Sequence, residues 1–382
     1  MANERGRVGI VGGGIAGLGA AIALRASGWD VTVYERAQRF TEVGAAVFLS
    51  GNAVRALDAL GLGDAVRAHA VANRPCAVRN SRGRLLFGAH LDDFVGGLVA
   101  IHRADLIALL AAAVPDDCVR LGTRVLGADE TGRIETDSGT TTYDFVVAAD
   151  GVHSRLRQSL WPGTPVRRTG ILSWRWVLDT PAPADAGFFW GHDAECGVVP
   201  MVGDRTVVYA AARSPILEPD HFRTWPAPVP ELIAGAGPDR AVRTELLEIA
   251  VPRRLWRGRV VLLGDAGHAM LPTLGQGACQ ALEDAVTLAA CLPDPARYSA
   301  LRRRRVAALS FAARQGMRLT GPGSAATAAM RDAMLAATPD PVVLGALRAV
   351  SRRAIGRWSP PPAPAGYAVS SGRSGGSAGN PS

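Results

Sequence analysis

The residues with the clearest chemical potential lie in the stretch LLGDAGHAMLPTLGQGACQALEDA, from Leu262 to Ala285. An acid, Asp265, follows an apolar run, and Pro272 and a glycine loop from Gly275 precede a segment of helical character. A helix N-terminus carries unpaired N–H groups and a positive dipole, which favour a ligand group that is or becomes negative. The stretch therefore predicts a site where an acid, a rigid loop and backbone dipoles act together.

The same stretch contains residues that could suggest a metal site or a Cys/His nucleophile, namely Asp265, His268 and Cys279. Their spacing matches no zinc signature, and no second histidine lies near His268 in the sequence. We therefore predict no metal and interpret His268 as a hydrogen-bonding loop residue. Glu283 and Asp284 are interpreted as acids on a helix face, close to an N-terminal turn that suits their charge.

A second motif is VGIVGGGIAGLGAAIALRASGWDVTVYER near the start of the chain. Gly12, Gly14 and Gly17 have the spacing that allows a tight turn, close approach of the backbone to a pyrophosphate, and close packing of helix on strand. Glu35 follows about 20 residues later, where a carboxylate accepts hydrogen bonds from ribose hydroxyls. The motif predicts a dinucleotide site. An acid at this position disfavours a 2′-phosphate, so NADP is the poorer occupant, and NAD and FAD both remain.

A third motif, DFVVAADGVHSRLR, is a further element that a simple NAD domain does not need. Its apolar run predicts a fully buried strand that ends at Asp150 and Gly151. His153 and Ser154 are predicted to cap or brace the loop that follows, because the chain contains no GxSxG nucleophile elbow.

The elements that must position these motifs follow from periodicity and turn residues. Residues 7–12, 14–27 and 29–34 predict a strand, a helix and a strand, a βαβ unit, and further helices are predicted over 51–60 and 104–114. Residues 166–251 instead predict aromatic-rich strands broken by Pro and Gly, with a hairpin at the turn VGDR, and thus a largely antiparallel sheet. Helical patterns return after Ala278 and continue to about Arg357.

Composition narrows the function classes. The chain has 382 residues, 48% of them hydrophobic, five scattered cysteines without a CxxC pair, and a net charge of +8 in which every basic residue is Arg. The arginines are spread along the chain and no nucleic-acid reader motif is present, so we predict no nucleic-acid partner. The one dense run, Arg302 to Arg305, is predicted to form a solvated or pyrophosphate-facing helix surface. The longest apolar run, Leu106 to Val114, is too short to span a bilayer, and no signal-peptide pattern opens the sequence, so we expect a cytoplasmic protein without stable membrane association.

The three motifs, in this order, resemble those of the single-component (group A) FAD-dependent monooxygenases of the para-hydroxybenzoate hydroxylase type. This group includes salicylate hydroxylase, urate hydroxylase and kynurenine 3-monooxygenase, and the resemblance extends to about Arg357. It implies an α/β fold in which a Rossmann-like FAD-binding domain of the glutathione-reductase type carries an inserted, largely antiparallel substrate domain and C-terminal helices. The expected FAD-binding domain is discontinuous, with residues 1–74, 98–165 and 252–357. The expected substrate domain has residues 75–97 and 166–251, and residues 358–382, rich in Pro, Gly and Ser, are predicted to be a disordered tail.

The resemblance also implies roles for individual residues. Glu35 would bind the ribose, Arg36 would lie near the adenosine, Val125 near the adenine, and Arg103 beside the ribityl and pyrophosphate groups. Asp265 would hold the ribityl chain, and the Asp150–Gly151 segment would contribute to both FAD and nicotinamide nucleotide binding. The expected FAD-binding set is Gly12, Gly14, Ala16, Gly17, Glu35, Arg36, Arg103, Val125, Asp150, Gly151, Asp265, Pro272, Gly275, Gln276, Gly277 and Ala278. Gly267 and Cys279 depart from the commonest family pattern without touching the acid, the proline or the glycines.

The substrate side gives weaker signals. Leu172, Trp174, Trp176 and Leu178 alternate onto one face of a predicted strand, with Ser173, Arg175 and Val177 on the other. These aromatics, with Phe188, Phe189, Trp190 and Tyr209, suit either a pocket for a flat substrate or a plain sheet core. Arg175 and Arg213 are candidates to hold an anionic or phenolate substrate. The candidate catalytic residues are Arg175, Tyr209, Arg213 and Pro272.

The activity that the resemblance implies is a hydroxylation. NADH or NADPH, bound transiently, would reduce FAD, molecular oxygen would give a flavin C4a-hydroperoxide, and one oxygen atom would pass to an aromatic or conjugated small molecule. The chain has no second GxGxxG motif, which argues against disulfide reductases and Baeyer-Villiger enzymes. Two alternatives remain at this point: an FAD-dependent reductase or dehydrogenase acting on a lipid or polyene double bond, and a non-catalytic flavin-binding protein.

Overall fold

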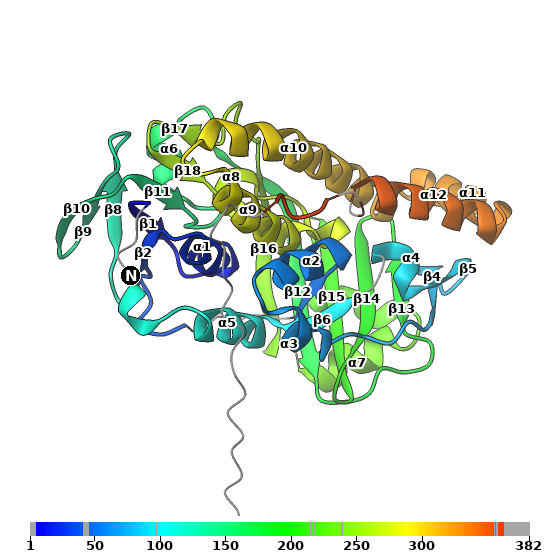
Figure 1. Cartoon of the computed structure of the whole chain (residues 1–382). Helices are drawn as coiled ribbons and strands as arrows, with labels where there is room; N and C mark the ends of the chain where they lie inside the picture. The colour runs from blue at the N-terminus through cyan, green and yellow to red at the C-terminus, as the bar shows by residue number, and fades with distance from the viewer. Residues whose placement is uncertain are drawn as a thin grey trace, which may run out of the picture.

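Two sheets organise the molecule. A computed structural model describes residues 5–40, 46–95, 98–213, 215–216, 218–237, 240–354, 356 and 358–362. Figure 1 shows a mainly parallel sheet near the N-terminus and a large antiparallel sheet at the other end, with the long helix α10 (Pro295–Thr320) running along both. The predicted α/β class, with a mainly parallel sheet and a second, largely antiparallel sheet, is confirmed.

The first sheet has six strands, of which all but the edge strand β17 run parallel. In spatial order they are β17 (Trp256–Arg257), β18 (Val260–Leu262), β11 (Phe145–Ala148), β1 (Arg7–Val11), β2 (Asp30–Tyr34) and β7 (Val119–Arg120). Val8, Ile10 and Val147 are fully buried, as expected for parallel strands covered on both faces.

Helices cover one face of this sheet and a small sheet covers the other. The helices predicted over 14–27, 51–60 and 104–114 are present as α1 (Ile15–Ala26), α2 (Gly51–Ala59) and α5 (Arg103–Ala112), and they share a core with α9 (Gly277–Cys291). The opposite face packs against α6 (Arg155–Leu160) and the three-stranded sheet of β8 (Val125–Ala128), β9 (Arg133–Thr136) and β10 (Gly139–Thr142).

The second sheet has seven strands, and all its neighbours are antiparallel except the parallel pair of β13 and β4. In spatial order they are β16 (Val242–Ile249), β12 (Val166–Leu178), β15 (Arg205–Arg213), β14 (Ala194–Met201), β13 (Gly187–Trp190), β4 (Pro75–Asn80) and β5 (Leu85–His90). The hairpin predicted at VGDR joins β14 to β15, with Asp204 at a φ of 52°. Residues 75–90 and 166–249 share this sheet, which is consistent with placing both segments in one substrate domain. The division into an FAD-binding and a substrate domain remains a proposal.

A short strand pair connects the two regions. It consists of β3 (Ala46–Leu49) and β6 (Val99–His102), and Ala100 and Phe48 pack against Met201 and Val207 of the second sheet. Since α5 begins directly after β6, residue 103 stands where the two regions meet.

The C-terminal helices α11 (Ala325–Ala337) and α12 (Asp340–Ala354) lie over the far end of the second sheet (Figure 1). Among the described residues, no single helix is both long enough and apolar enough to span a membrane. The pair α11 and α12 meets both criteria together, with a bend of 109° between the two helices. The predicted tail was expected to begin at residue 358, but Trp358 is still part of the fold. Trp358 packs against the core of the parallel sheet and its carbonyl accepts from Arg55 Nε at 3.1 Å, whereas residues 363–382 lie outside the described part.

Candidate active site

The glycine loop between β1 and α1 has the geometry that its sequence predicts. Gly12 has a φ of 109°, and a Cβ there would lie 2.3 Å from the carbonyl oxygen of Ala149. A Cβ on Gly17 would lie 1.9 Å from the Gly12 carbonyl oxygen, so close packing of loop, helix and β11 excludes any side chain at either position. Gly14 is the N-cap of α1, whose first-turn N–H groups have no partner within the helix and point toward the end of β1.

Glu35 lies directly against this loop. Its Oε2 accepts from the Gly13 N–H at 2.7 Å and its Oε1 from the Ala37 N–H at 2.8 Å. Each oxygen keeps a further lone pair, which suits the predicted contact with ribose hydroxyls. Arg36 is exposed beside it, and the Thr123 N–H donates to the Glu35 carbonyl at 3.0 Å, which brings the segment before Val125 to the same edge.

Val125 itself packs inward. Its side chain belongs to the core cluster under the small sheet, with Tyr34 and Tyr143. Tyr34 and Tyr143 share a hydrogen bond of 2.7 Å between their hydroxyls. Only the backbone of Val125 is therefore available toward an adenine.

Asp150 and Gly151 directly follow β11, and one carboxylate oxygen of Asp150 has no hydrogen-bond partner. Asp150 Oδ2 accepts from the Arg155 N–H at 2.9 Å, but Oδ1 is buried and has no partner. Burial raises the pKa of Asp150, and hydrogen bonds from Ser154 and the α6 backbone offset only part of this effect. Gly151 has a φ of 80°, and a Cβ there would meet nothing within 4 Å. An unpaired acceptor beside open space fits a ligand that carries hydroxyl groups.

Two further residues of this motif have structural roles. Ser154 caps α6, as predicted, by accepting from the Arg157 N–H at 2.9 Å. Arg157, which the sequence did not single out, is fully buried and donates to the carbonyls of Val152, Thr164 and Ala266. It therefore ties the third motif to the Asp265 segment; its only sequence signal was its place three residues after a capping serine.

The opening stretch forms a turn, the short helix α8 (Asp265–His268), a loop and then α9. A Cβ on Gly264 would lie 2.8 Å from the Ala16 Cβ, so this turn abuts the glycine-loop helix. Asp265 is exposed although its neighbours are buried, and the nearest atom to a Cβ on Gly277 would be Asp265 Oδ1, at 4.0 Å. The acid and the N-terminus of α9 thus face the same space.

The loop before α9 presents backbone rather than side chains. Gly275 has a φ of 61° and its N–H donates to the Pro272 carbonyl at 2.7 Å, while Pro272 is exposed. The Gln276 side chain is buried and bonded to Ser50 and Asn52. Gln276 can therefore serve a cofactor only through its backbone, like Gly277 and Ala278 in the first turn of α9, whose N–H groups have no intrahelical partner.

Two half-buried arginines, Arg103 on α5 and Arg175 on β12, lie near Asp265 or near each other. Burial lowers the pKa of Arg103 at the start of α5, and the charge of Asp265 partly opposes that shift. Burial also lowers the pKa of Arg175 on β12, and the positive charge of Arg103 lowers it further. Arg175 Nη2 donates to Thr244 Oγ1 at 2.9 Å, and its Nε is buried without a partner. The structure thus brings Arg103, Arg175 and Asp265 together between the two sheets.

The faces of β12 resolve the two alternatives for the aromatic residues. Trp174 and Trp176 are 1% and 2% exposed and pack with Phe189, Phe222 and other residues into a core on the outer face of the sheet, away from Arg175. These aromatics, with Leu172 and Leu178 at its edge, form a plain core and not a substrate pocket. Phe188 and Trp190 pack with a different cluster under α12.

Tyr209 alone of the predicted aromatics pairs with Arg175 in the sheet and shares its inner face. Arg213 also lies on this face, but four residues along β15, where its Nε donates to the Gly321 carbonyl at the end of α10 at 3.3 Å. The sequence-based candidates therefore separate: Arg175 and Tyr209 lie together, and Arg213 is engaged at the helix end.

Three predictions about charged residues are wrong in part. His268 is hydrogen-bonded as predicted, with Nε2 2.5 Å from Asp284 Oδ2, but it ends α8 and is fully buried rather than lying in a loop. Glu283 and Asp284 lie on a helix as predicted, but in the buried middle of α9 and paired with Arg302, not beside its N-terminal turn. In the run from Arg302 to Arg305, Arg304 is exposed as predicted, whereas Arg302 is 1% exposed and faces these acids. We call His268, Glu283, Asp284, Arg302 and Arg305 the α9–α10 ion cluster.

Comparison with known proteins identifies the family. A family model described as FAD binding domain matches residues 5–304. The aurachin C monooxygenase/isomerase of Stigmatella aurantiaca is 36% identical over 325 residues, covering 78% of this chain and 85% of that protein. The chain belongs to the FAD-dependent monooxygenase family. The present chain is also 36% identical to the 3-amino-4-hydroxybenzoate 2-monooxygenase of Streptomyces cremeus, covering 88% of this chain and 93% of that protein.

A solved structure supports the same assignment. Klebsiella pneumoniae HpxO, complexed with FAD and uric acid, matches this monooxygenase with a TM-score of 0.81 at 29% identity, covering 90% of this chain and 96% of HpxO. FAD is thus the cofactor of the enzyme, and NADH or NADPH as reductant is typical of the family. The glycine loop, the unpaired Asp150 oxygen and the N-termini of α1 and α9 fit this cofactor.

Proposed function

We propose that this monooxygenase hydroxylates a small aromatic or conjugated molecule that binds between the inner face of the seven-stranded sheet and the Pro272–Gly275 loop. The observation that carries the proposal is the proximity of Arg103, which begins α5 where the two sheets meet, to Asp265 on one side and Arg175 on the other. Electron uptake from the nicotinamide and activation of oxygen are the chemistry that bound FAD supplies there.

The residues of the chain would then bind, orient and exclude water. Glu35, Asp150 and Asp265 would accept hydrogen bonds from cofactor hydroxyls, and the first-turn N–H groups of α1 and α9 would favour its negative groups. Arg175 would hold an oxygen atom or an anionic group of the substrate, because its buried Nε still lacks a hydrogen-bond partner. Pro272, which has no N–H, would stiffen the loop above the substrate.

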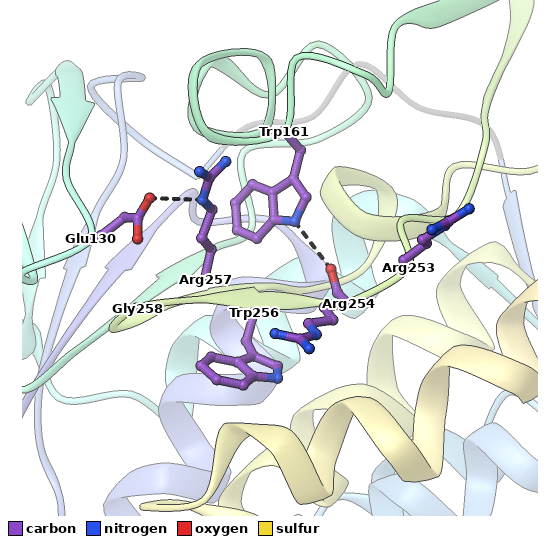
Figure 2. A pocket seen from close by; sticks show the side chains of 7 residues that line it. All are labelled: Glu130, Trp161, Arg253, Arg254, Trp256, Arg257 and Gly258. Carbon is purple, nitrogen blue, oxygen red and sulfur yellow. Dashed lines mark hydrogen bonds and ion pairs between the residues drawn. The ribbon is translucent and has the colours of Figure 1, made fainter.

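The nicotinamide reductant is proposed to dock at the β17 edge of the parallel sheet. A cavity of about 450 Å³, shown in Figure 2, is lined by Glu130, Trp161, Arg253, Arg254, Trp256, Arg257 and Gly258. Trp161 also lines an adjoining cavity of about 350 Å³ that contains His153 of the third motif. Exposed arginines beside tryptophan rings suit a pyrophosphate and a stacked base.

Docking there makes a specific prediction for Arg254→Ser. The KM for the nicotinamide cofactor should rise several-fold while the FAD content of the purified protein stays unchanged. Arg304→Ser, at an exposed position of α10, is the matched control and should change neither value. An unaltered KM in Arg254→Ser would place the docking site elsewhere.

The activity itself is tested with the FAD-loaded enzyme, NADH or NADPH, and a panel of phenols, amino-substituted benzoates and N-heteroaromatics under oxygen-18 gas. Mass spectrometry should detect one oxygen-18 atom in a product. Reduction of a substrate without oxygen-18 incorporation would contradict a monooxygenase and support a reductase instead.

A further inference from the structure

The direction of the Asp265 carboxylate depends on the backbone that carries it. Asp265 is exposed at the start of α8, and no group in the described part of the chain donates a hydrogen bond to its side chain. Glu35 differs, because the N–H groups of Gly13 and Ala37 hold its two oxygens in place. Whether Asp265 meets a cofactor hydroxyl is therefore decided by the turn of the chain that precedes it.

That turn is made by Gly264, between β18 and α8. Its φ of 58° and ψ of −141° form a conformation that a residue with a side chain rarely adopts, and a Cβ there would lie 2.8 Å from the Ala16 Cβ. The helix that follows has only four residues, Asp265–His268, and a single helical turn is not stable by itself. Contacts from the rest of the fold must therefore fix the turn.

Two buried side chains bind the backbone on either side of this turn. Asp284 Oδ2 on α9 accepts from the Gly264 N–H at 3.0 Å, and the Tyr298 hydroxyl on α10 donates to the Leu262 carbonyl at 3.1 Å. Both side chains are fully buried, and α10 packs on α8 and α9 (Figure 1). We call Asp284 and Tyr298 the turn-holding pair. Loss of the polar group of either residue leaves a backbone group of the turn unpaired in the interior.

Asp284 also reaches the far end of α8. Its Oδ2 lies 2.5 Å from His268 Nε2, and the His268 N–H donates to the Gly264 carbonyl at 2.9 Å. Its Oδ1 accepts from Arg302 Nε at 2.6 Å, which holds the carboxylate in one orientation. The contacts of Asp284 thus enclose Asp265, from the residue before it to the last residue of its helix.

We propose that the turn-holding pair positions Asp265 for the cofactor: Asp284 and Tyr298 fix the Gly264 turn and thereby set the distance between the Asp265 carboxylate and the ribityl hydroxyls of FAD. This inference rests on the proposed function, which assigns a cofactor contact to Asp265, and it adds two residues buried behind the turn. They act through the backbone, because their polar atoms are bonded within the protein. A hydrogen bond weakens once its distance and angle leave a narrow range, so a loosened turn should loosen FAD.

The test measures the rate at which FAD leaves the holoenzyme after dilution, followed by flavin fluorescence. Tyr298→Phe removes one hydroxyl and keeps the ring, and it should release FAD roughly threefold to tenfold faster than wild type, as expected for the loss of about one hydrogen bond. Asp284→Asn should act in the same direction. The matched control is Thr206→Val in the other sheet, which removes a buried hydroxyl that donates to the Thr180 carbonyl at 2.7 Å and should leave the release rate unchanged.

A second comparison separates positioning from a general loss of stability. In an Asp265→Ala background, Tyr298→Phe should change the release rate by less than about twofold, because the contact that it positions is already missing. A role confined to folding would give the same factor in both backgrounds. If Asp284→Asn yields no folded holoenzyme, Tyr298→Phe in the two backgrounds gives the answer alone.

Three outcomes would overturn the positioning role: an unchanged release rate in Tyr298→Phe, an equal factor with and without Asp265, or an equally faster release in Thr206→Val. The proposed function fails in a different way. An unchanged release rate in Asp265→Ala would remove the assigned cofactor contact together with this inference, whereas oxygen-18 incorporation by wild type is measured independently of both. Faster release from Asp265→Ala without an effect of Tyr298→Phe would remove the positioning role alone.

Discussion

Two sets of buried polar residues in this enzyme differ in how completely their charges are paired. In the α9–α10 ion cluster, Arg302 bonds to both Glu283 and Asp284, Arg305 bonds to Glu283 through two nitrogens, and His268 bonds to Asp284. On the face of the seven-stranded sheet that carries Arg175 and Glu195, by contrast, no described carboxylate pairs with Arg175 and no described cation pairs with Glu195.

We interpret the fully paired charges of the ion cluster as structural and the unpaired groups, Arg175 and Glu195, as available to a ligand. A buried charge that lacks a partner costs folding free energy, and such costs persist in proteins where a ligand uses the group. The cluster, whose charges are compensated, instead joins α9 to α10 and reaches the loop before α9 through Gln280 and Gln276.

Breaking the ion cluster should cost the most stability. Arg302→Met leaves Glu283 and Asp284 buried with reduced compensation, and such a change costs about 3–5 kcal/mol of unfolding free energy. Urea denaturation measures it. Arg304→Met, on the exposed side of the same helix, is the control and should stay within about 0.5 kcal/mol of wild type. Equal effects of the two variants would refute a structural role for the cluster.

The two buried carboxyls should respond oppositely to pH. Burial raises the pKa of Asp284, but His268 and Arg302 more than reverse this, so its net pKa lies below the ordinary 3.8. Its contribution to stability is thus present above pH 3.8 and is lost as pH falls through the lowered pKa. The raised pKa of Glu195 has the opposite sign, because its ionisation destabilises the fold as pH rises from 4.5 through the raised value.

Denaturation of variants across pH 4 to 8 tests this contrast. Glu195→Gln should gain stability relative to wild type as pH rises above 4.5. Asp284→Asn should remain less stable than wild type throughout that range. A loss of stability in Glu195→Gln that is independent of pH would indicate that Glu195 belongs with the scaffold.

Moving the Tyr209 ring should disturb the site more than the fold. Gly197→Ala introduces a Cβ that collides with this ring, at a cost of about 1–3 kcal/mol, and should weaken 4-aminobenzoate binding several-fold. Gly127→Ala, in β8, is the control, because a Cβ there meets nothing within 4 Å. Calorimetric melting and flavin absorbance titration give the two values, and unchanged 4-aminobenzoate affinity in Gly197→Ala would count against Tyr209 as a wall of the site.

The smallest effect is expected at an exposed ion pair. Arg257 and Glu130 are 2.7 Å apart beside the cavity of Figure 2, with about half of each side chain exposed to solvent. Glu130→Gln should change the unfolding free energy by less than about 1 kcal/mol, because water screens such pairs. A larger loss in urea denaturation would show that pairing matters here as much as in the buried cluster.

The parallel half of the fold could be predicted from the sequence because local signals specify it. Gly12 and Gly17 are required where backbone approaches backbone, and Glu35 comes at the end of the next strand, so spacing alone places them. Alternation in β12 likewise separated Trp174 from Arg175, but it could not say which face was core. That depended on α7 (Val229–Ala236) and Phe222 covering the outer face, which are contacts distant in sequence.

The ion cluster could not be predicted for a related reason. Glu283 and Arg302 lie on separate helices, and acids near one helix start and arginines along another are usually solvated. Only the packing of α10 on α9 makes them partners. Glu195 carried no motif at all, and its interest arises from the register of three strands.

The contrast between paired and unpaired buried charge is tested most directly by thermal unfolding of Arg175→Met beside Arg302→Met, without ligand. Arg175→Met removes a half-buried cation that has no described carboxylate partner, and it should melt at or above the temperature of wild type. Arg302→Met should melt several degrees lower. If Arg175→Met lost as much stability as Arg302→Met, Arg175 would be part of the scaffold, and the assignment of the inner face to substrate binding would be contradicted.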